Sequence, residues 1–360
     1  MALALVLKQL TDPHFNLFKT FDTLPKITQI MGEVQENLIE DSSLSLSTHA
    51  GDIKNLFTEL PHNEVEKSVI WTLKKVQSLK HCRGRKSVTL NLRCKSSSRI
   101  GPSYDSDSII NISFEKIYKI CMFDMENAYF YIKDHILKQI HGIPQGSPLS
   151  PTLAQCCLIY IESQFLSSIY DNTYFHGLRY FDDIRLLSFS YTDSQIVRSR
   201  NTISSFIHAL PSSLSLEPEF SSHSFYFLEC LITFTPPTFM IIYLSKNYAF
   251  YKEHKRLKFY TFQNFYSYHS NRVLIASNNL RSKFSAISKY CNSSLAIYIS
   301  TLSWFQDFIL AEYPASILIS VLNEFYFKSS QAVCKKLAQE VSSDYSPRDD
   351  IFNFKYCQFS

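Results

Sequence analysis

Glycine is scarce in this sequence, and long apolar runs are absent. Only 7 of the 360 residues are glycine, so tight turns must depend on Asn, Asp, Ser and Pro. A membrane-spanning helix needs about 20 predominantly apolar residues. No segment approaches that length, and we expect no contact with a membrane. The first residues, "MALALVLKQL", show no cleavage-site pattern, so we do not expect secretion.

The sequence also lacks the cysteine patterns that indicate disulfides or zinc. Its nine cysteines are odd in number and include no Cys-x-x-Cys pair. Reduced, mostly buried thiols are typical of intracellular proteins. We therefore expect an intracellular protein, in a mitochondrion or the nucleus. A short organelle-targeting segment at the N-terminus stays open as an interpretation.

Apolar and aromatic residues are plentiful. Hydrophobic residues make up 45% of the chain, with 29 Phe and 22 Tyr. That composition supports a buried core, and the length suits one large domain or two to three subdomains. The net charge of +4 is only mildly basic, so the distribution of charge is more informative than the sum.

Residues 178–187, "LRYFDDIRLL", place two aspartates between apolar segments. The pattern predicts two short strands that meet at Asp182 and Asp183, with both carboxylates at the tip of a hairpin. Adjacent carboxylates repel each other unless a cation lies between them. Mg²⁺ is bound by one or two carboxylates together with substrate phosphates. A solvated turn is the simpler interpretation of an Asp-Asp pair considered alone.

A third carboxylate follows the apolar segment 117–130, "IYKICMFDMENAYF". We interpret this segment as a strand that ends at Asp124, so that its side chain emerges at the strand terminus. Two metal ions about 3.5–4 Å apart, held by three carboxylates, activate a primer 3′-OH and stabilise the leaving pyrophosphate.

Other segments have clearer local patterns. Residues 142–150 form a loop rich in Gly, Pro and Ser, followed by an apolar helix with Pro151 near its start, where proline is tolerated. Alternation predicts a strand at 87–93, and apolar runs predict strands at 224–234 and 238–244. Helices are expected in much of the chain after residue 245.

Three segments in this order resemble conserved motifs of reverse transcriptases. "FDMENAY", "GIPQGSPLSP" and "YFDD" are similar to motifs A, B and C of that family, and the resemblance covers about residues 115–290. It is strongest for the branch that holds Penelope-like elements and telomerase. Group II intron and other non-LTR reverse transcriptases are the alternatives.

The resemblance implies an α+β right-hand polymerase fold, with fingers, a palm whose antiparallel sheet packs on helices, and a helical thumb. It divides the chain into an N-terminal extension (1–70), a basic fingers-like region (71–116), a palm (117–244) and a thumb-like region (245–360). The implied activity is RNA-directed DNA synthesis by two-metal-ion nucleotidyl transfer. Its implied partners are an RNA template, a DNA primer and dNTP.

The resemblance also assigns roles to residues. Asp124, Asp182 and Asp183 would bind Mg²⁺ or Mn²⁺, Tyr129 would select the sugar of the dNTP, and Gln145 and Gly146 would contact the nascent base pair. The implied nucleic-acid contacts are Phe227 and Leu228 of a primer grip, then Lys252, Lys255, Arg256, Arg272 and Arg281. The fingers candidates for the triphosphate are Arg83, Arg85, Lys86, Arg93 and Lys95.

Two features depart from the family pattern. Gln145 follows Asp124 by only 21 positions, where relatives have a longer segment, and residues 191–230 contain no lysine to act as a general acid. Both features keep a second interpretation open, in which the protein is a catalytically weak or inactive RNA-binding, maturase-like relative. An RNA-dependent RNA polymerase is disfavoured because Phe181 replaces the glycine of its Gly-Asp-Asp motif.

Overall fold

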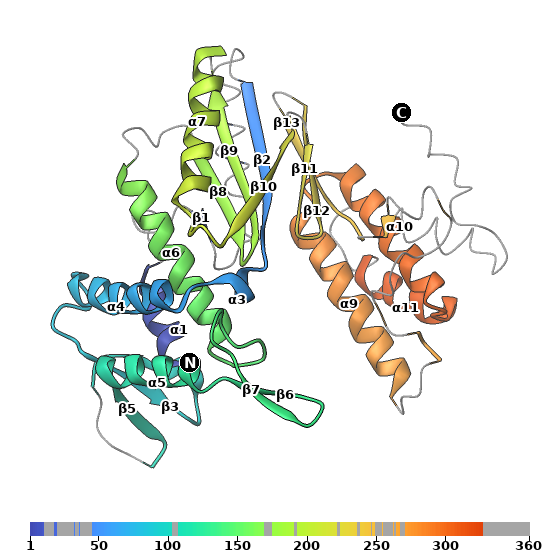
Figure 1. Cartoon of the computed structure of the whole chain (residues 1–360). Helices are drawn as coiled ribbons and strands as arrows, with labels where there is room; N and C mark the ends of the chain where they lie inside the picture. The colour runs from blue at the N-terminus through green and yellow to red at the C-terminus, as the bar shows by residue number, and fades with distance from the viewer. Residues whose placement is uncertain are drawn as a thin grey trace. The chain divides into compact units, whose positions relative to one another are not determined.

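The computed structural model divides the chain into two compact units. The first comprises Met1–Ile30 and Ser43–Ser222, and the second comprises Met31–Ser42 and His223–Ser360. The residues that the structure describes are 1–10, 18–19, 32, 36, 45–102, 107–168, 175–190, 193–221, 224–235, 238–245, 247–248, 254, 262, 264–266 and 271–326. Each unit has its own sheet and helices (Figure 1).

A five-stranded sheet organises the first unit, in the order β1-β8-β9-β2-β10. Its strands are β1 (Phe18–Lys19), β2 (Ser45–Lys54), β8 (Phe175–Tyr180), β9 (Asp183–Ser190) and β10 (Ser215–Ser221). All neighbours are antiparallel except β1 and β8. The hairpin predicted around Asp182 and Asp183 is confirmed as β8–β9, so the sheet carries the Asp-Asp pair at one end.

Strand β2 lies between β9 and β10, inside the sheet. The sequence analysis assigned this segment to the N-terminal extension 1–70 and predicted no strand there. The end of β2 alternates, with Gly51 and Ile53 buried and Asp52 and Lys54 exposed, which is the period of a half-buried strand. The predicted extension 1–70 therefore supplies a central strand of the sheet that contains the Asp-Asp pair.

Helices cover one face of this sheet and join it to the rest of the unit (Figure 1). Ile184 and Leu186 of β9 share a continuous core with Leu153 and Phe165 of α6 and with Phe206 of α7. The helices of this unit are α1 (Ala2–Leu7), α3 (Leu56–Glu59), α4 (His62–Ser78), α5 (Phe114–Glu126), α6 (Ser150–Ser168) and α7 (Asp193–Ala209). The predicted apolar helix with proline in its first turn is confirmed as α6.

The segment around Asp124 is helix α5, not a strand, so that prediction was wrong. Ser113 caps the helix by accepting a hydrogen bond from the Lys116 N–H at 3.1 Å, as N-cap serines do. The buried residues recur every three or four positions and are Phe114, Ile117, Cys121 and Met125. This helical period was obscured by the overall apolar character of the run.

Two small sheets complete the first unit. The strand predicted at 87–93 is confirmed as β3 (Ser87–Asn91), which pairs with β4 (Arg99–Ile100) and β5 (Ile109–Ser113). Strands β6 (Tyr129–Ile132) and β7 (His135–Lys138) form a two-stranded hairpin of their own. This hairpin ends just before the loop that leads into α6.

The second unit combines a three-stranded antiparallel sheet with helices. Its elements are β11 (Ser224–Phe227), β12 (Cys230–Thr235), β13 (Thr238–Tyr243), α9 (Arg272–Tyr290), α10 (Ser294–Leu310) and α11 (Ala315–Tyr326). The single strand predicted at 224–234 is instead two strands, because the chain turns at Leu228 with φ 57°. Trp304 of α10 donates its indole N–H to the Tyr243 carbonyl at 3.0 Å, which fixes the helix on the sheet.

The fold is mixed helix and sheet, with a mainly antiparallel sheet packed on helices, as the sequence predicted at that level. The unit boundary falls at residues 222/223, whereas the predicted palm ended at residue 244. Within the described ranges, none of the helices has both the length and the apolar character required to span a bilayer.

Candidate active site

The turn of the β8–β9 hairpin consists of Phe181 and Asp182, and Asp183 begins β9. Phe181 has φ 54°, a conformation that bulky residues rarely adopt. Strained backbone of this kind is found at sites where the surrounding structure fixes a functional side chain. The turn therefore holds the two aspartates in a defined position rather than on a loose surface loop.

A buried arginine fixes this turn to helix α6. The side chain of Arg179 on β8 is fully buried, and its Nε lies 2.5 Å from Glu162 Oε1. Its Nη1 donates to Gln155 Oε1 at 2.8 Å and to the Phe181 carbonyl at 3.3 Å. A buried charge requires such partners to offset its lost hydration. Arg179 therefore ties the hairpin turn to two side chains of α6.

Sequence reasoning missed the carboxylate nearest to the Asp-Asp pair in the sheet. Asp52 of β2 is directly opposite Asp183 of β9 in the antiparallel register, and the Ile53 N–H donates to the Asp182 carbonyl at 3.0 Å. Directly opposite residues point to the same face, with Cβ atoms about 4.5–5.5 Å apart. The sequence signal that could have revealed Asp52 is the alternation of apolar and charged residues in "GDIK", which predicts a strand end that carries an aspartate.

Two cations lie beside these carboxylates. Arg185 Nη1 is 2.6 Å from Asp183 Oδ1, and Lys54 Nζ is 3.6 Å from Asp52 Oδ2. Each cation is two residues from its aspartate and so projects from the same face of the sheet. Like charges directly opposite each other destabilise a sheet, and these cations offset part of that repulsion.

Asp124 lies on a helix and not in the sheet that carries Asp182 and Asp183. It lies on α5, where its Oδ2 accepts a hydrogen bond from Ser147 Oγ at 2.7 Å. Burial, and then the charge of Asp124, raise the pKa of the neighbouring Cys121 thiol to about 12. Across the described residues, no three His, Cys, Asp or Glu side chains form a group that could hold a metal ion, whether Asp124 or Asp52 is taken as the third acid.

The loop before α6 is fixed to the segment that follows β2. Ile143 is buried, and its N–H donates to the Phe57 carbonyl at 2.7 Å. Gly142 has φ 73°, and a Cβ there would lie 2.5 Å from the Thr58 carbonyl oxygen. His62 Nε2 is within 2.6 Å of the Gly142 carbonyl oxygen. The backbones therefore approach so closely that only glycine fits at position 142.

The two predicted substrate residues of this loop lie just before α6. Gly146 is exposed and has φ 97°, with open space where a Cβ would be, and Gln145 beside it is also exposed. Ser150 stabilises the loop by donating its hydroxyl to the Pro144 carbonyl. A rigid loop with exposed backbone can approach a ligand closely.

Tyr129 is on strand β6, and its side chain is 57% exposed. Its predicted role rested on a spacing of five residues after Asp124. Phe57 has the same spacing after Asp52, and its carbonyl accepts a hydrogen bond from the N–H of the loop residue Ile143. If Asp52 is counted as the first acid in place of Asp124, the aromatic residue at the fifth position after it is Phe57.

The predicted nucleic-acid contacts of the second unit differ in their surroundings. Phe227 is fully buried, so it packs in the core of its unit, and Leu228 forms the following turn. Arg272 is exposed and lies 5.4 Å from the centre of the Phe265 ring. Arg281 forms an ion pair of 2.8 Å with Glu324 of α11. Lys252, Lys255 and Arg256 lie outside the described residues.

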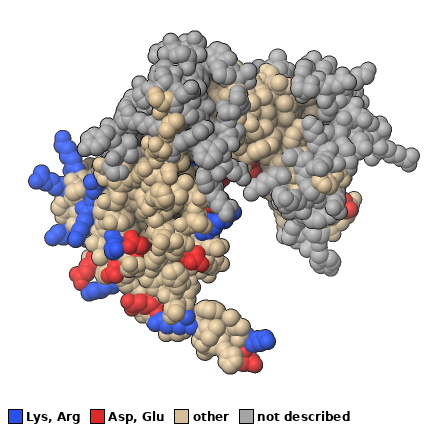
Figure 2. Space-filling view, turned by 45° about the horizontal axis from the view of Figure 1, so that its top comes forward, with Lys and Arg blue, Asp and Glu red and all other residues tan. Residues whose placement is uncertain are grey.

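A basic surface runs along the first unit from the end of α4 to β4. Residues 67–104 contain no Asp or Glu. Figure 2 shows Lys and Arg side chains gathered on one side of this unit. The exposed Lys and Arg residues of 74–99, called here the basic segment, are Lys74, Lys80, Arg83, Arg85, Lys86, Arg93, Lys95 and Arg99. This segment includes all five residues predicted as fingers contacts.

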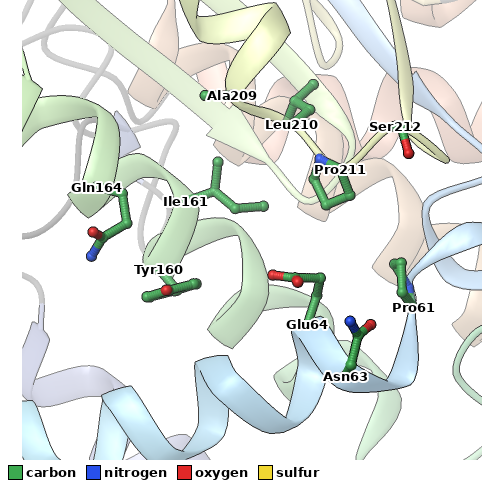
Figure 3. A pocket seen from close by; sticks show the side chains of 10 residues that line it. All are labelled: Pro61, Asn63, Glu64, Tyr160, Ile161, Gln164, Ala209, Leu210, Pro211 and Ser212. Carbon is green, nitrogen blue, oxygen red and sulfur yellow. The ribbon is translucent and has the colours of Figure 1, made fainter.

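A cavity of about 450 Å³ lies among α4, α6 and the end of α7 (Figure 3). Glu64 and Tyr160 line it from two of these helices, and Leu210 and Pro211 line it beyond the third. None of the aspartates of the sheet reaches it. The cavity is therefore separate from the candidate active site.

The chain is similar in structure to telomerases. It matches apo telomerase from Candida tropicalis with a TM-score of 0.53 and 14% identity, over 95% of this chain and 49% of that chain. It matches telomerase from Candida albicans in complex with a TWJ fragment of telomeric RNA with a TM-score of 0.51 and 14% identity, over 95% of this chain and 57% of that chain. It therefore spans about half the length of these telomerases.

No protein-family model matches the sequence, and no curated protein matches it. The likeness to telomerase, which is a reverse transcriptase, therefore shows the fold alone. The resemblance predicted from the sequence is confirmed at the level of the fold, which is similar to that of these telomerases.

Proposed function

We propose that this protein is a nucleotidyltransferase that extends a DNA primer on an RNA template with dNTP substrates. The observation that carries the proposal is the register of the sheet, which sets Asp52 opposite Asp183 and next to the turn that holds Asp182. Two opposed carboxylates on adjacent strands and a third in the hairpin turn are a donor set suited to two-metal nucleotidyl transfer. The telomerase-like fold is in keeping with this chemistry.

Asp52 replaces Asp124 as the third catalytic carboxylate in this proposal. The all-oxygen donor set fits Mg²⁺ or Mn²⁺, and the ions would supply an activated primer 3′-OH and charge stabilisation at the leaving pyrophosphate. Asp183 Oδ1 would have to exchange Arg185 for metal, because the guanidinium lies 2.6 Å away. With Asp52 in this role, 93 positions separate the first acid from Gln145, so the short spacing noted in the sequence disappears.

The neighbouring residues would position the substrates. Phe57 would lie under the sugar of the incoming nucleotide, in place of Tyr129. Gln145 and Gly146 would approach the nascent base pair from the loop that hydrogen bonds to the Phe57 carbonyl. Arg179 would act as a positioning residue, since it holds the turn that contains Asp182.

The proposed binding of RNA and primer rests on charge. The basic segment offers eight exposed cations with no acidic residue in residues 67–104, and cations of this kind neutralise phosphates. One of the telomerases of similar fold was solved with a TWJ fragment of telomeric RNA. In this proposal the first unit contains the fingers and palm and the second unit contains the thumb, where Leu228, Lys252, Lys255, Arg256, Arg272 and Arg281 would contact template and primer.

Primer extension on poly(rA)/oligo(dT) with Mg²⁺ or Mn²⁺ tests the proposal. Asp52→Asn should lower the rate about 1,000-fold, because removal of a metal ligand takes away several kcal/mol of transition-state stabilisation. Asp107→Asn, which removes an exposed carboxylate elsewhere in the unit, should leave extension unchanged. Equal rates for wild type and Asp52→Asn would contradict the assignment.

A second candidate function is RNA binding without synthesis. The observation that favours it is the set of cations at the carboxylates, since Arg185 and Lys54 are engaged with Asp183 and Asp52. A protein of this kind would retain RNA in a filter-binding assay and show no extension with either metal. Extension that depends on Asp52 would exclude it.

A further inference from the structure

The hairpin β6–β7 exposes an unusual amount of apolar surface. All eight residues of its two strands are exposed, and the hairpin extends from the body of the first unit as an arm (Figure 1). Its large exposed side chains are Tyr129, Phe130, Tyr131, Ile132, Ile136 and Leu137. An isolated two-stranded hairpin is only marginally stable in water, and exposed apolar patches mark binding surfaces. The exposed apolar surface of the arm therefore indicates a binding surface.

One face of the arm combines aromatic rings with a cation. The register pairs Tyr129 with Lys138 and Tyr131 with Ile136, so these four side chains share a face. Tyr131 is 75% exposed, and the Lys138 ammonium lies 6.0 Å from the centre of the Tyr129 ring. We call this surface the tyrosine face. Proteins that bind single-stranded nucleic acid combine aromatic rings, on which bases stack, with cations that bind the phosphates.

The charge of the arm favours a nucleic acid over an apolar protein surface. Lys133 forms the tip with φ 53°, and Asp134 is the only acidic residue in the sequence from residue 127 to residue 161. Neither Lys133 nor Lys138 forms an ion pair with any residue that the structure describes. The arm therefore presents two cations that phosphates can neutralise.

The arm is also fixed to the candidate active site. The Gln139 N–H donates to the Ala128 carbonyl at 2.8 Å and so closes the base of the hairpin. Gln139 Nε2 donates to the His141 carbonyl at 2.8 Å, and the next residues are the loop that is held by Phe57. A strand bound on the arm would therefore be held at a constant position relative to the loop that carries Gln145.

We infer that the tyrosine face binds an unpaired nucleic-acid strand, with bases stacked on Tyr129 and Tyr131 and phosphates at Lys133 and Lys138. The choice of partner rests on the proposed polymerase function, and the strand is the single-stranded part of the template. Stacking on a ring is tolerant of sequence because every base has a π-face. The site therefore selects single strands over duplex, since duplex bases are already stacked.

The test is the affinity of the full-length protein for fluorescein-labelled oligo(rU), measured by fluorescence anisotropy. Tyr131→Ala should raise the Kd about tenfold, as expected when one base can no longer stack, whereas Tyr131→Phe should keep the affinity. Phe123→Ala is the matched control, because Phe123 is an aromatic residue of α5 that is 66% exposed and lies outside the arm. Lys138→Gln should reduce the slope of log K against log salt by about 0.7.

Direct contact is measured separately in a Tyr131→Trp variant, whose added fluorescence should be quenched by oligo(rU) and not by duplex. Repeating the binding in an Asp52→Asn background separates this inference from the proposed chemistry, because binding should persist when synthesis is abolished. Unchanged affinity of Tyr131→Ala, or no binding of oligo(rU) by the wild type, would overturn the inference. It would also be overturned if Tyr131→Ala abolished self-association in size-exclusion chromatography and left oligo(rU) affinity unchanged, since the arm would then be a protein interface.

Discussion

At the scale of single residues, the central feature of this protein is the pair of opposed carboxylates of Asp52 and Asp183. Opposed like charges weaken a sheet, and the chain offsets them with Arg185 and Lys54. These ion pairs would have to separate for a metal ion to bind to Asp183 and Asp52. Position 52 was missed because Asp52 and its partner Asp183 are far apart in the chain, and local pattern does not reveal which strands pair.

At the same scale, Phe57 is predicted to select the sugar of the incoming nucleotide. Phe57→Ala should admit ribonucleotides and lower discrimination between dNTP and rNTP about tenfold or more, in the range typical of a specificity pocket from which a bulky group is removed. Single-nucleotide insertion kinetics with dTTP and UTP measure this ratio. Tyr129→Ala should leave the ratio unchanged, and the opposite pattern would restore Tyr129 to the role predicted from the sequence.

At the scale of helices and strands, elements with local sequence signals were predicted correctly, and elements that depend on distant parts of the chain were not. Helix α6 and the β8–β9 hairpin were predicted correctly because their signals are local, namely a Pro/Ser helix start and two apolar runs around a polar turn. Strand β2 was missed because its stability comes from neighbours more than 100 residues away in the chain, β9 and β10. The apolar pattern of α5 predicts a strand because apolar residues are so frequent there that the helical period of 3.6 is hard to distinguish.

The close approach between the loop before α6 and the segment after β2 can be tested by mutation. Gly142→Ala combines a positive φ with a Cβ 2.5 Å from the Thr58 carbonyl oxygen, so we expect a decrease of about 2–3 kcal/mol in the free energy of unfolding, the cost typical of overpacking with backbone strain. Urea denaturation measures it. Gly84→Ala is the control, since Gly84 also has positive φ (79°) but open space around a Cβ, and it should cost only about 1 kcal/mol. Equal decreases for the two variants would show that the close approach at Gly142 is not constraining.

At the scale of the whole molecule, positive charge is concentrated in one segment although the net charge is small. A chain with a net charge of +4 places eight exposed cations in a segment free of acids. The sequence showed this density, but it could not show that the segment shares a unit with Asp52 and Asp183, because that follows from the sheet topology. For the same reason the sequence could not show that a segment of the predicted N-terminal extension forms a strand of that sheet.

The basic segment should therefore dominate the salt dependence of RNA binding. A Lys80→Gln, Arg83→Gln, Lys86→Gln triple variant should lower the slope of log K against log salt by about 2, because each cation that neutralises a phosphate of a single strand contributes about 0.7 to that slope. Lys116→Gln, which removes an exposed lysine of α5, is the control and should leave the slope unchanged. If the triple variant kept the wild-type slope, the basic segment would be a solvated surface only.

The most direct test of the central claim is the binding of Mn²⁺, followed by electron paramagnetic resonance of the free ion, in the wild type, Asp52→Asn and Asp124→Asn. We predict that the wild type and Asp124→Asn bind Mn²⁺ equally and that Asp52→Asn fails to bind it. Failure of Asp124→Asn to bind Mn²⁺, with Asp52→Asn unaffected, would contradict the account.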